Sequence, residues 1–240
     1  MVLRFLGTRG EIEARTRAHR MHASLEVAYR GRSVMIDCGA DWRARVWRLA
    51  PKAIVLTHAH PDHAAGLRDG APCPVWATEE TWRVLARYPV ADRRVLRPRV
   101  ATRIRGITFE AFPVVHSLIA PAVGLRITAG RARIFYVPDL VYIPDRAAAL
   151  KDVDVYVGDG ASLVRPLVRR RAGTPIGHAA VRTQLGWCAK EGVPHAIITH
   201  CGTQIVTADA RAVAARVRAM GEERGVRAEV ARDGMRVRLP

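Results

Sequence analysis

The sequence predicts an α/β fold in which two sheets pack together and helices cover their outer faces. Strand-like runs and segments with helical spacing occur in both halves of the chain, which favours a layered arrangement. No Ser- or Gly-rich linker, low-complexity tract or repeat divides the chain, so residues 1–240 are expected to form a single domain. With 240 residues and 49% hydrophobic content, the chain can bury a sizeable core without disulfides.

The first third of the chain alternates strand and helix signals. Gly31 between two alternating runs indicates a hairpin, and Thr78 followed by two glutamates is typical of a helix start. The expected strands are Val2–Leu6, Ser24–Arg30, Ser33–Asp37, Ala53–Thr57 and Pro74–Ala77, and the expected helices are Asp41–Ala50 and Thr78–Arg87.

Strand signals continue through the middle of the chain, and helices return near its end. Gly192 is a stop signal for the helix before it, and the Asp233-Gly234 pair between two alternating runs predicts a terminal hairpin. The expected strands are Ile104–Phe112, Ala122–Thr128, Ala132–Val137, Val153–Gly158 and His195–Thr199, and the expected helices are His178–Glu191 and Thr207–Met220.

Cysteine usage and hydropathy indicate the cellular compartment. The four cysteines are scattered and form no C-x-x-C pair, which argues against a disulfide framework and against a thiolate zinc knuckle. The apolar runs are too short to span a membrane, and the first ten residues lack the apolar segment of a secretory signal. We therefore expect a cytoplasmic protein with no membrane partner, for which a homodimer is allowed.

The net charge of +17 is unusual, and only three of the 39 basic residues are lysines. Codon usage that favours arginine would explain this, and so would an anionic ligand, because guanidinium groups fit phosphate oxygens. The arginines occur in nearly every segment, and their densest run is Arg165–Arg171. The composition favours a small anionic substrate and allows nucleic acid without favouring it.

The strongest chemical signal is the run Thr57-His58-Ala59-His60-Pro61-Asp62-His63 at the end of an expected strand. In extended backbone, residues two apart point to the same side, so His58 and His60 can reach one ion. Pro61 is preset for a helix start, which would turn Asp62 and His63 toward a neighbouring point. Imidazole and carboxylate ligands suit zinc, and manganese or iron would fit them too.

Three further polar residues each follow an apolar strand: His116, Asp139 and His200. Strand ends can gather on one rim of a sheet, so these residues would complete the ligands of two metal ions. The order Asp37, His58-x-His60-x-Asp62-His63, His116, Asp139, His200 resembles the metallo-β-lactamase superfamily over nearly the whole chain.

The resemblance implies an αββα sandwich, two central mixed sheets with helices outside, and two metal ions at the sheet rim. It implies that one ion is bound by His58, His60 and His116, and that the other is bound by Asp62, His63 and His200. Asp139 would bridge the ions, and Asp37 would orient the ligand loops without coordinating.

Further residues resemble the branch of RNase Z and the cyclic-phosphate phosphodiesterases (PhnP-like). His178 matches a histidine beside the metal site, with general acid or phosphate-oxygen donor as its role, and Asp159 would orient its ring. A plain turn role for Asp159 stays open. Arg20 and His22 in the N-terminal loop are candidate substrate contacts, with packing as the alternative for His22.

These features predict a dinuclear metal-dependent hydrolase that acts on small or cyclic phosphodiesters. A metal-bridging hydroxide would attack phosphorus, Asp62 and Asp139 would position it, and His178 would protonate the leaving group. Two alternatives stay open: a lactone, thioester or β-lactam hydrolase on the same site, and an RNA- or DNA-processing nuclease. Only 22 residues separate His116 from Asp139, which leaves no room for the tRNA-gripping arm usual in RNase Z.

Overall fold

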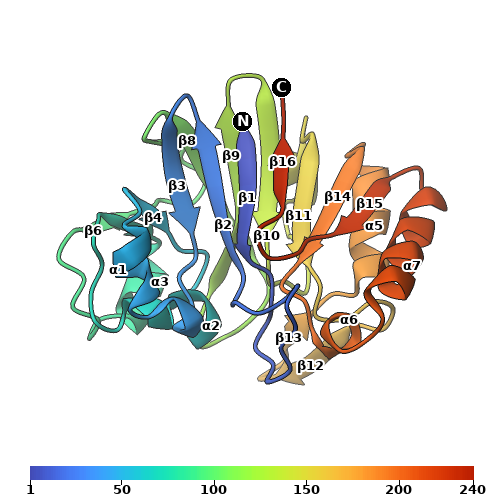
Figure 1. Cartoon of the computed structure of the whole chain (residues 1–240), viewed down its shortest axis with the longest axis horizontal. Helices are drawn as coiled ribbons and strands as arrows, with labels where there is room; N and C mark the ends of the chain where they lie inside the picture. The colour runs from blue at the N-terminus through green and yellow to red at the C-terminus, as the bar shows by residue number, and fades with distance from the viewer.

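The computed structural model describes all residues from Met1 to Pro240 and contains two seven-stranded mixed sheets that pack face to face (Figure 1). The first sheet has the order β16-β1-β2-β3-β4-β5-β6 and the second has the order β15-β14-β11-β10-β9-β8-β7. The strands of the first sheet are β1 Val2–Gly7, β2 Ser24–Tyr29, β3 Arg32–Ile36, β4 Ile54–Val55, β5 Val75–Ala77, β6 Arg93–Val95 and β16 Arg236–Arg238. Those of the second are β7 Thr102–Ile104, β8 Ile107–Val114, β9 Ala122–Ala129, β10 Ala132–Val137, β11 Val155–Asp159, β14 His195–Thr199 and β15 Arg227–Val230.

Helices cover the outer face of each sheet, so the layers run helix, sheet, sheet, helix (Figure 1). This is the αββα architecture that the sequence predicts. The helices are α1 Arg45–Leu49, α2 Pro61–Ala64, α3 Glu79–Val84, α4 Arg146–Leu150, α5 Val181–Lys190, α6 Thr203–Val206 and α7 Ala210–Glu222, and the 3₁₀ turns are η1 Ala40–Trp42 and η2 Ala65–Leu67. None of the helices combines the length and apolar character needed to cross a bilayer.

Alternation of side chains along the strands builds three apolar layers. In β10, Ile134 and Tyr136 join the layer between the two sheets, whereas Phe135 and Val137 pack toward α4 and α5. A third layer lies between the first sheet and helices α1 and α3. Each aliphatic side chain buried in this way contributes about 1.5–3 kcal/mol to stability relative to exposure.

Two expected elements are divided in the structure. The single strand predicted at Ile104–Phe112 is instead the β7–β8 hairpin, whose turn at Arg105 and Gly106 has positive φ at both residues. The helix predicted at Asp41–Ala50 is a 3₁₀ turn and a short helix, because Ala44 has a φ of 59° between them. Helix propensity gave no sign of the break at Ala44.

The predicted terminal hairpin is wrong. β15 pairs in parallel with β14 in the second sheet, and β16 pairs antiparallel with β1 in the first. The Asp233-Gly234 turn therefore carries the chain from one sheet to the other, which brings the two termini together (Figure 1). The Asp233 carboxylate accepts hydrogen bonds from the backbone N–H groups of Arg20 and Met21 and from the Thr8 hydroxyl, and so holds the N-terminal loop.

A small hairpin, β12 Leu167–Arg171 with β13 Thr174–His178, was not expected. His178 is the last residue of β13 and does not begin α5, as the sequence had suggested. This hairpin, α2 and α6 lie at the lower end of the sandwich in Figure 1. The same end receives the residues that follow β3, β4, β8, β10, β11 and β14, so it is where the polar side chains meet.

Candidate metal centre

The sequence-predicted metal ligands converge at one edge of the sandwich because they follow strands that run in the same direction. β3 and β4 are parallel in the first sheet, and β10, β11 and β14 are parallel in the second. β8 and β10 are both antiparallel to β9, so they too point the same way. Residues just beyond the carboxyl ends of these strands therefore face each other across the two sheets.

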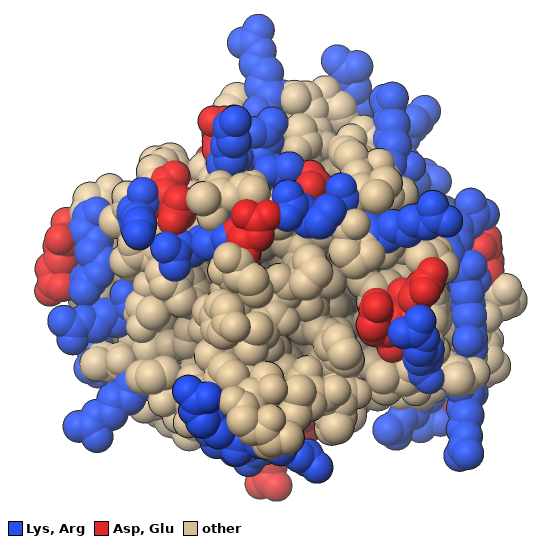
Figure 2. All heavy atoms as spheres, turned by 180° about the vertical axis from the view of Figure 1, so that it is seen from behind, with Lys and Arg blue, Asp and Glu red and all other residues tan.

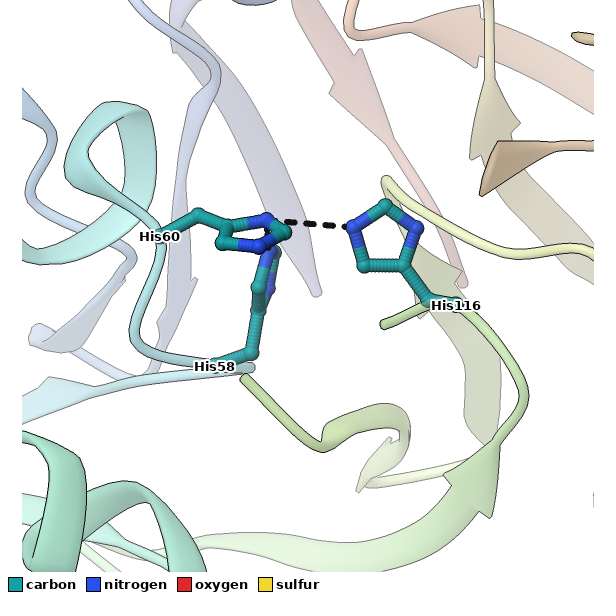
Figure 3. Close-up of side chains that lie close together, drawn as sticks. All are labelled: His58, His60 and His116. Carbon is teal, nitrogen blue, oxygen red and sulfur yellow. Dashed lines mark hydrogen bonds between the residues drawn. The ribbon is translucent and has the colours of Figure 1, made fainter. Parts of the chain in front are cut away.

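The first cluster contains His58, His60 and His116, whose rings point toward one another (Figure 3). His58 Nε2 lies 3.0 Å from His60 Nδ1, which lies 3.1 Å from His116 Nε2. Tetrahedral zinc with nitrogen ligands at 2.0–2.1 Å would hold them about 3.3 Å apart, close to this spacing. Figure 3 also shows that the rings come from two segments far apart in sequence.

In His58 and His116, the ring nitrogen that points away from the cluster contacts another part of the protein. His116 Nδ1 donates to the carbonyl of Gly177 at 2.9 Å, which leaves a lone pair on the inward-facing Nε2. His58 Nδ1 lies 3.0 Å from the Thr57 hydroxyl. Such outer hydrogen bonds set the tautomer and orientation of a metal-binding imidazole.

The second cluster contains Asp62, His63, Asp139 and His200, and all four side chains are buried. Asp62 and His63 lie on α2, as the position of Pro61 predicts. Asp139 Oδ2 lies 2.7 Å from His63 Nε2 and 3.4 Å from His58 Nε2, so this one carboxylate faces both clusters. This is the placement that a bridging ligand requires.

Several polar atoms of the second cluster fit a metal ion better than they fit one another. His63 Nε2, His200 Nδ1 and Asp139 Oδ1 are buried without a hydrogen-bond partner, although charged groups lie within 3.2 Å. The atoms are close but are not aligned as donor and acceptor. Buried polar atoms nearly always find partners, so atoms that converge in this way are typical of a shared cation.

The electrostatics of the two clusters differ. Burial lowers the pKa of His58 well below its usual value and, with the neighbouring His116, lowers that of His60 to about 4. Both rings are therefore neutral and can donate a lone pair. Around His63, burial acts in the same direction, but the carboxylates of Asp62 and Asp139 outweigh it and raise its pKa well above the usual value. The buried negative charge of this cluster favours a cation.

Asp37 supports the second cluster from behind. Its fully buried carboxylate lies 2.9 Å from His63 Nδ1 and accepts hydrogen bonds from the backbone N–H of Thr57 at 2.8 Å and from the Thr57 hydroxyl. Asp37 and His200 both have positive φ, at 61° and 50°, a region that non-glycine residues rarely occupy. Asp37 thus joins the loop after β3 to a histidine on α2.

His178 lies beside the clusters and is held by Asp159. Its Nδ1 lies 2.8 Å from Asp159 Oδ2 and 3.2 Å from Asp139 Oδ1. Burial opposes the charged ring, but these two carboxylates prevail and raise the pKa of His178 to about 11 in the metal-free chain. With Nδ1 engaged, Nε2 is the ring nitrogen left for the adjoining grooves.

Gln184 is a supporting residue that sequence reasoning missed. Its side chain is fully buried, accepts the backbone N–H of Asp159 and donates to the carbonyl of the same residue. It also lies 2.9 Å from the Tyr156 hydroxyl. The sequence does contain a signal for this role: Gln184 is a polar residue next to Leu185, on the otherwise apolar face of the helix that packs on the sheet.

The two predicted substrate contacts are not members of the clusters, although His22 Nε2 lies 3.9 Å from the carboxylate of Glu11. Arg20 has an exposed side chain, and its backbone is bound by Asp233 and Arg9. His22 is buried, and its Nδ1 accepts the backbone N–H of Asp41. Neither residue lines the cavities at the centre. Arg9 was not predicted to be buried, yet it is almost fully enclosed and pairs with Asp41.

Two grooves meet at the clusters, and His60, His116, Leu167 and His178 line both. The Glu11 groove, about 610 Å³, continues past Glu11, Ile12, Thr203 and Gln204. The Arg169 groove, about 630 Å³, continues past Leu118, Ile119, Arg169 and Arg171 along the β12–β13 hairpin. A substrate with two arms can therefore place its reacting centre at the histidines and one arm in each groove.

Comparison with known proteins identifies the family. Residues 32–201 match the model described as the beta-lactamase superfamily domain. The ribonuclease Z of Methanopyrus kandleri is 38% identical over 72 residues, which cover 28% of this chain and 25% of that protein. The chain thus matches about a quarter of the length of this curated relative.

Solved structures share the fold over the whole chain. The metallo-beta-lactamase fold protein YhfI from Bacillus subtilis superposes with a TM-score of 0.75 at 14% identity, covering 98% of each chain. A diphosphatase from the PhnP family superposes with a TM-score of 0.73 at 21% identity, covering 100% of this chain and 98% of the other. The family match over residues 32–201 shows that the chain belongs to the β-lactamase superfamily, and its His/Asp clusters, which could hold metal ions, lie at the rim of the sandwich.

Proposed function

We propose that the protein is a dinuclear phosphodiesterase that acts on small or cyclic phosphodiesters. The observation that carries this proposal is the Asp159–His178 pair, which presents a ring nitrogen to the grooves directly beside the metal clusters. Hydrolysis of a phosphodiester releases an alkoxide, which needs a proton, and a histidine in this place can supply it. The likeness to a PhnP-family diphosphatase and to a ribonuclease Z agrees with a phosphorus ester as substrate.

In this proposal each cluster holds one ion, zinc in the first instance. His58, His60 and His116 would hold one, Asp62, His63 and His200 the other, and Asp139 would contact both. Two such ions supply a nucleophile from water at neutral pH and neutralise charge on phosphate oxygens. The carboxylates of Asp62 and Asp139 would in addition orient the attacking group.

The chain's own residues then handle the proton. His178 carries it on Nε2 while Asp159 holds Nδ1, so the ring keeps one orientation as it gives the proton up. Asp159 is itself fixed, because its Oδ1 accepts the backbone N–H of Ala161 at 2.8 Å and Gln184 binds its backbone. Asp159 is therefore a positioning residue, and His178 is the general acid.

Two observations favour a small phosphodiester over a long RNA. The segment between His116 and Asp139 is occupied by the β9–β10 hairpin and carries no additional arm. Figure 2 shows basic side chains spread along the margins of one face, interleaved with acidic ones, around a broad uncharged centre. A continuous basic track of the kind that binds a nucleic-acid backbone is not present on that face.

Leaving-group dependence tests this function. In the metal-loaded protein, His178→Ala should lower kcat/KM for 2′,3′-cyclic AMP by about 10²–10⁴, because an alkoxide leaves. The loss for bis(p-nitrophenyl) phosphate should be small, because p-nitrophenolate leaves without a proton. His195→Ala is the matched control, since His195 pairs with Glu229 away from the clusters. Equal losses on both substrates, with metal content unchanged, would reject the acid role.

The compartment and the domain organisation form part of the same proposal. All four cysteines are unpaired, which agrees with a reducing cytoplasm. One apolar layer contains residues of both sheets, and β16 returns to pair with β1, which supports a single domain over residues 1–240.

A further inference from the structure

The β12–β13 hairpin sorts its arginines onto two faces. In this antiparallel pair Leu167 is opposite His178, and Arg169 is opposite Ile176. Opposed residues share a face, and residues two apart along a strand share it too. The face that carries His178 therefore also carries Leu167, Arg169 and Arg171. Arg170 lies on the other face, where it donates to the carbonyl of Gly173.

The positions of Arg169 and Arg171 along β12 determine how far each lies from His178 and the metal centre. Residues two apart on a strand are about 7 Å apart, so Arg169 begins about 7 Å and Arg171 about 14 Å beyond the level of His178. Leu118, Ile119 and Leu167 line the same groove, and all three are exposed. The groove thus presents an apolar stretch first and guanidinium groups beyond it.

Both guanidinium groups are available to a ligand. The structure contains no ion pair for Arg169 or Arg171, whereas Arg43, Arg126 and Arg146 are each paired with a carboxylate. Arg169 and Arg171 are exposed. The opposite groove carries the carboxylate of Glu11. An anionic arm of a substrate would be attracted by one groove and repelled by the other.

We propose that the natural substrate is a phosphodiester with a second anionic group, bound by Arg169 and Arg171, and an apolar group that packs on Leu118 and Ile119. This inference rests on the proposed phosphodiesterase function and specifies its substrate class. A nucleotide with an additional phosphate on its sugar has this pattern: the scissile ester at the metal centre, the second phosphate at the arginines, and the base, carried by the sugar that joins them, along Leu118 and Ile119. Guanidinium groups bind phosphate oxygens in pairs, which gives orientation as well as affinity.

The test compares thymidine 5′-(p-nitrophenyl phosphate) with and without a 3′-phosphate, using the zinc-loaded protein. The 3′-phosphate should raise kcat/KM by about tenfold, the usual value of a charge-assisted contact. Arg169→Ala and Arg171→Ala should each remove most of this gain, so that the kcat/KM values for the two esters converge in these variants. Arg170→Ala removes the same charge from the other face and should keep the gain.

A binding measurement keeps the inference testable apart from hydrolysis. By calorimetry, the zinc-loaded protein should bind thymidine 3′,5′-bisphosphate about tenfold more tightly than thymidine 5′-phosphate, and Arg169→Ala should abolish the difference. No preference for the bisphosphate, or an equal loss in Arg170→Ala, would overturn the inference. Hydrolysis of both esters at equal rates would overturn it while leaving the phosphodiesterase intact. Failure to hydrolyse either ester would instead count against the proposed function.

Discussion

Substitution of Asp37 by asparagine should disable the second metal cluster without removing any ligand. One oxygen of Asp37 accepts the backbone N–H of Thr57, and the other lies against His63 Nδ1. In Asp37→Asn, the amide oxygen can still accept the backbone N–H of Thr57. The amide NH₂ group then faces His63 Nδ1, and this nitrogen must accept a hydrogen bond from it. The ring proton moves to Nε2, the atom that faces Asp139 at 2.7 Å, and the lone pair needed by a metal is lost.

The opposite amide orientation is no better, because the NH₂ group would then face the N–H of Thr57 and leave buried donors unpaired, at about 1–3 kcal/mol. Loss of such a supporting carboxylate typically weakens metal binding 10- to 100-fold, or about 1.4–2.8 kcal/mol. The first cluster is linked to Asp37 only through the Thr57 hydroxyl, which also lies 3.0 Å from the oxygen that the amide keeps, so its ion should be retained. The variant should therefore bind one zinc ion normally and the second more weakly.

Zinc titration against a competing chelator measures both affinities. Asp233→Asn is the matched control: this carboxylate also accepts backbone N–H groups, but it lies in the turn between the sheets. The control should lose stability and keep both zinc affinities. An Asp37→Asn protein that binds two zinc ions as tightly as wild type would refute the orienting role of Asp37.

Two further predictions concern packing and acid stability. A Cβ on Gly39 would lie 1.8 Å from the Asp62 carbonyl oxygen, so Gly39→Ala should displace α2, release zinc and lower the melting temperature. Gly186 in α5 has open space around it, so the control Gly186→Ala should keep zinc and should not lower the melting temperature. Burial, assisted by Arg9, lowers the pKa of His22 to about 4, so between pH 6.5 and 4 the unfolded chain binds a proton that the folded chain does not. The free energy of unfolding therefore decreases as the pH is lowered, and His22 contributes up to about 1.4 kcal/mol per pH unit to this decrease. In urea unfolding of the metal-free protein, His22→Gln should reduce this pH dependence. An unchanged pH dependence of stability in His22→Gln would contradict the lowered pKa of His22.

The sequence predicts that the His and Asp side chains converge because much of their signal is local. His58, His60, Asp62 and His63 lie within six residues, and Pro61 determines where the strand-end loop becomes helix. Thr78 caps its helix through its own side chain, as short-range propensity predicts. Strands of alternating apolar residues were located for the same reason.

The failures depend on long-range pairing. The Asp233-Gly234 turn has a hairpin sequence, but β16 finds its partner in β1, more than two hundred residues away. The position of His178 was predicted, but its setting was not, because β12–β13 is a polar, arginine-rich hairpin without an apolar face. The role of Arg20 and His22 as substrate contacts stays a prediction: the contacts of Asp233 and Asp41 hold their loop against the protein, and neither residue lines the two grooves.

The existence of two ions at the rim of the sandwich is the central claim, and anomalous X-ray diffraction at the zinc edge tests it most directly. Crystals grown with excess zinc should show two peaks: one among His58, His60 and His116, and one among Asp62, His63 and His200, with Asp139 between them. A single peak under zinc excess, or peaks outside these clusters, would contradict the dinuclear centre.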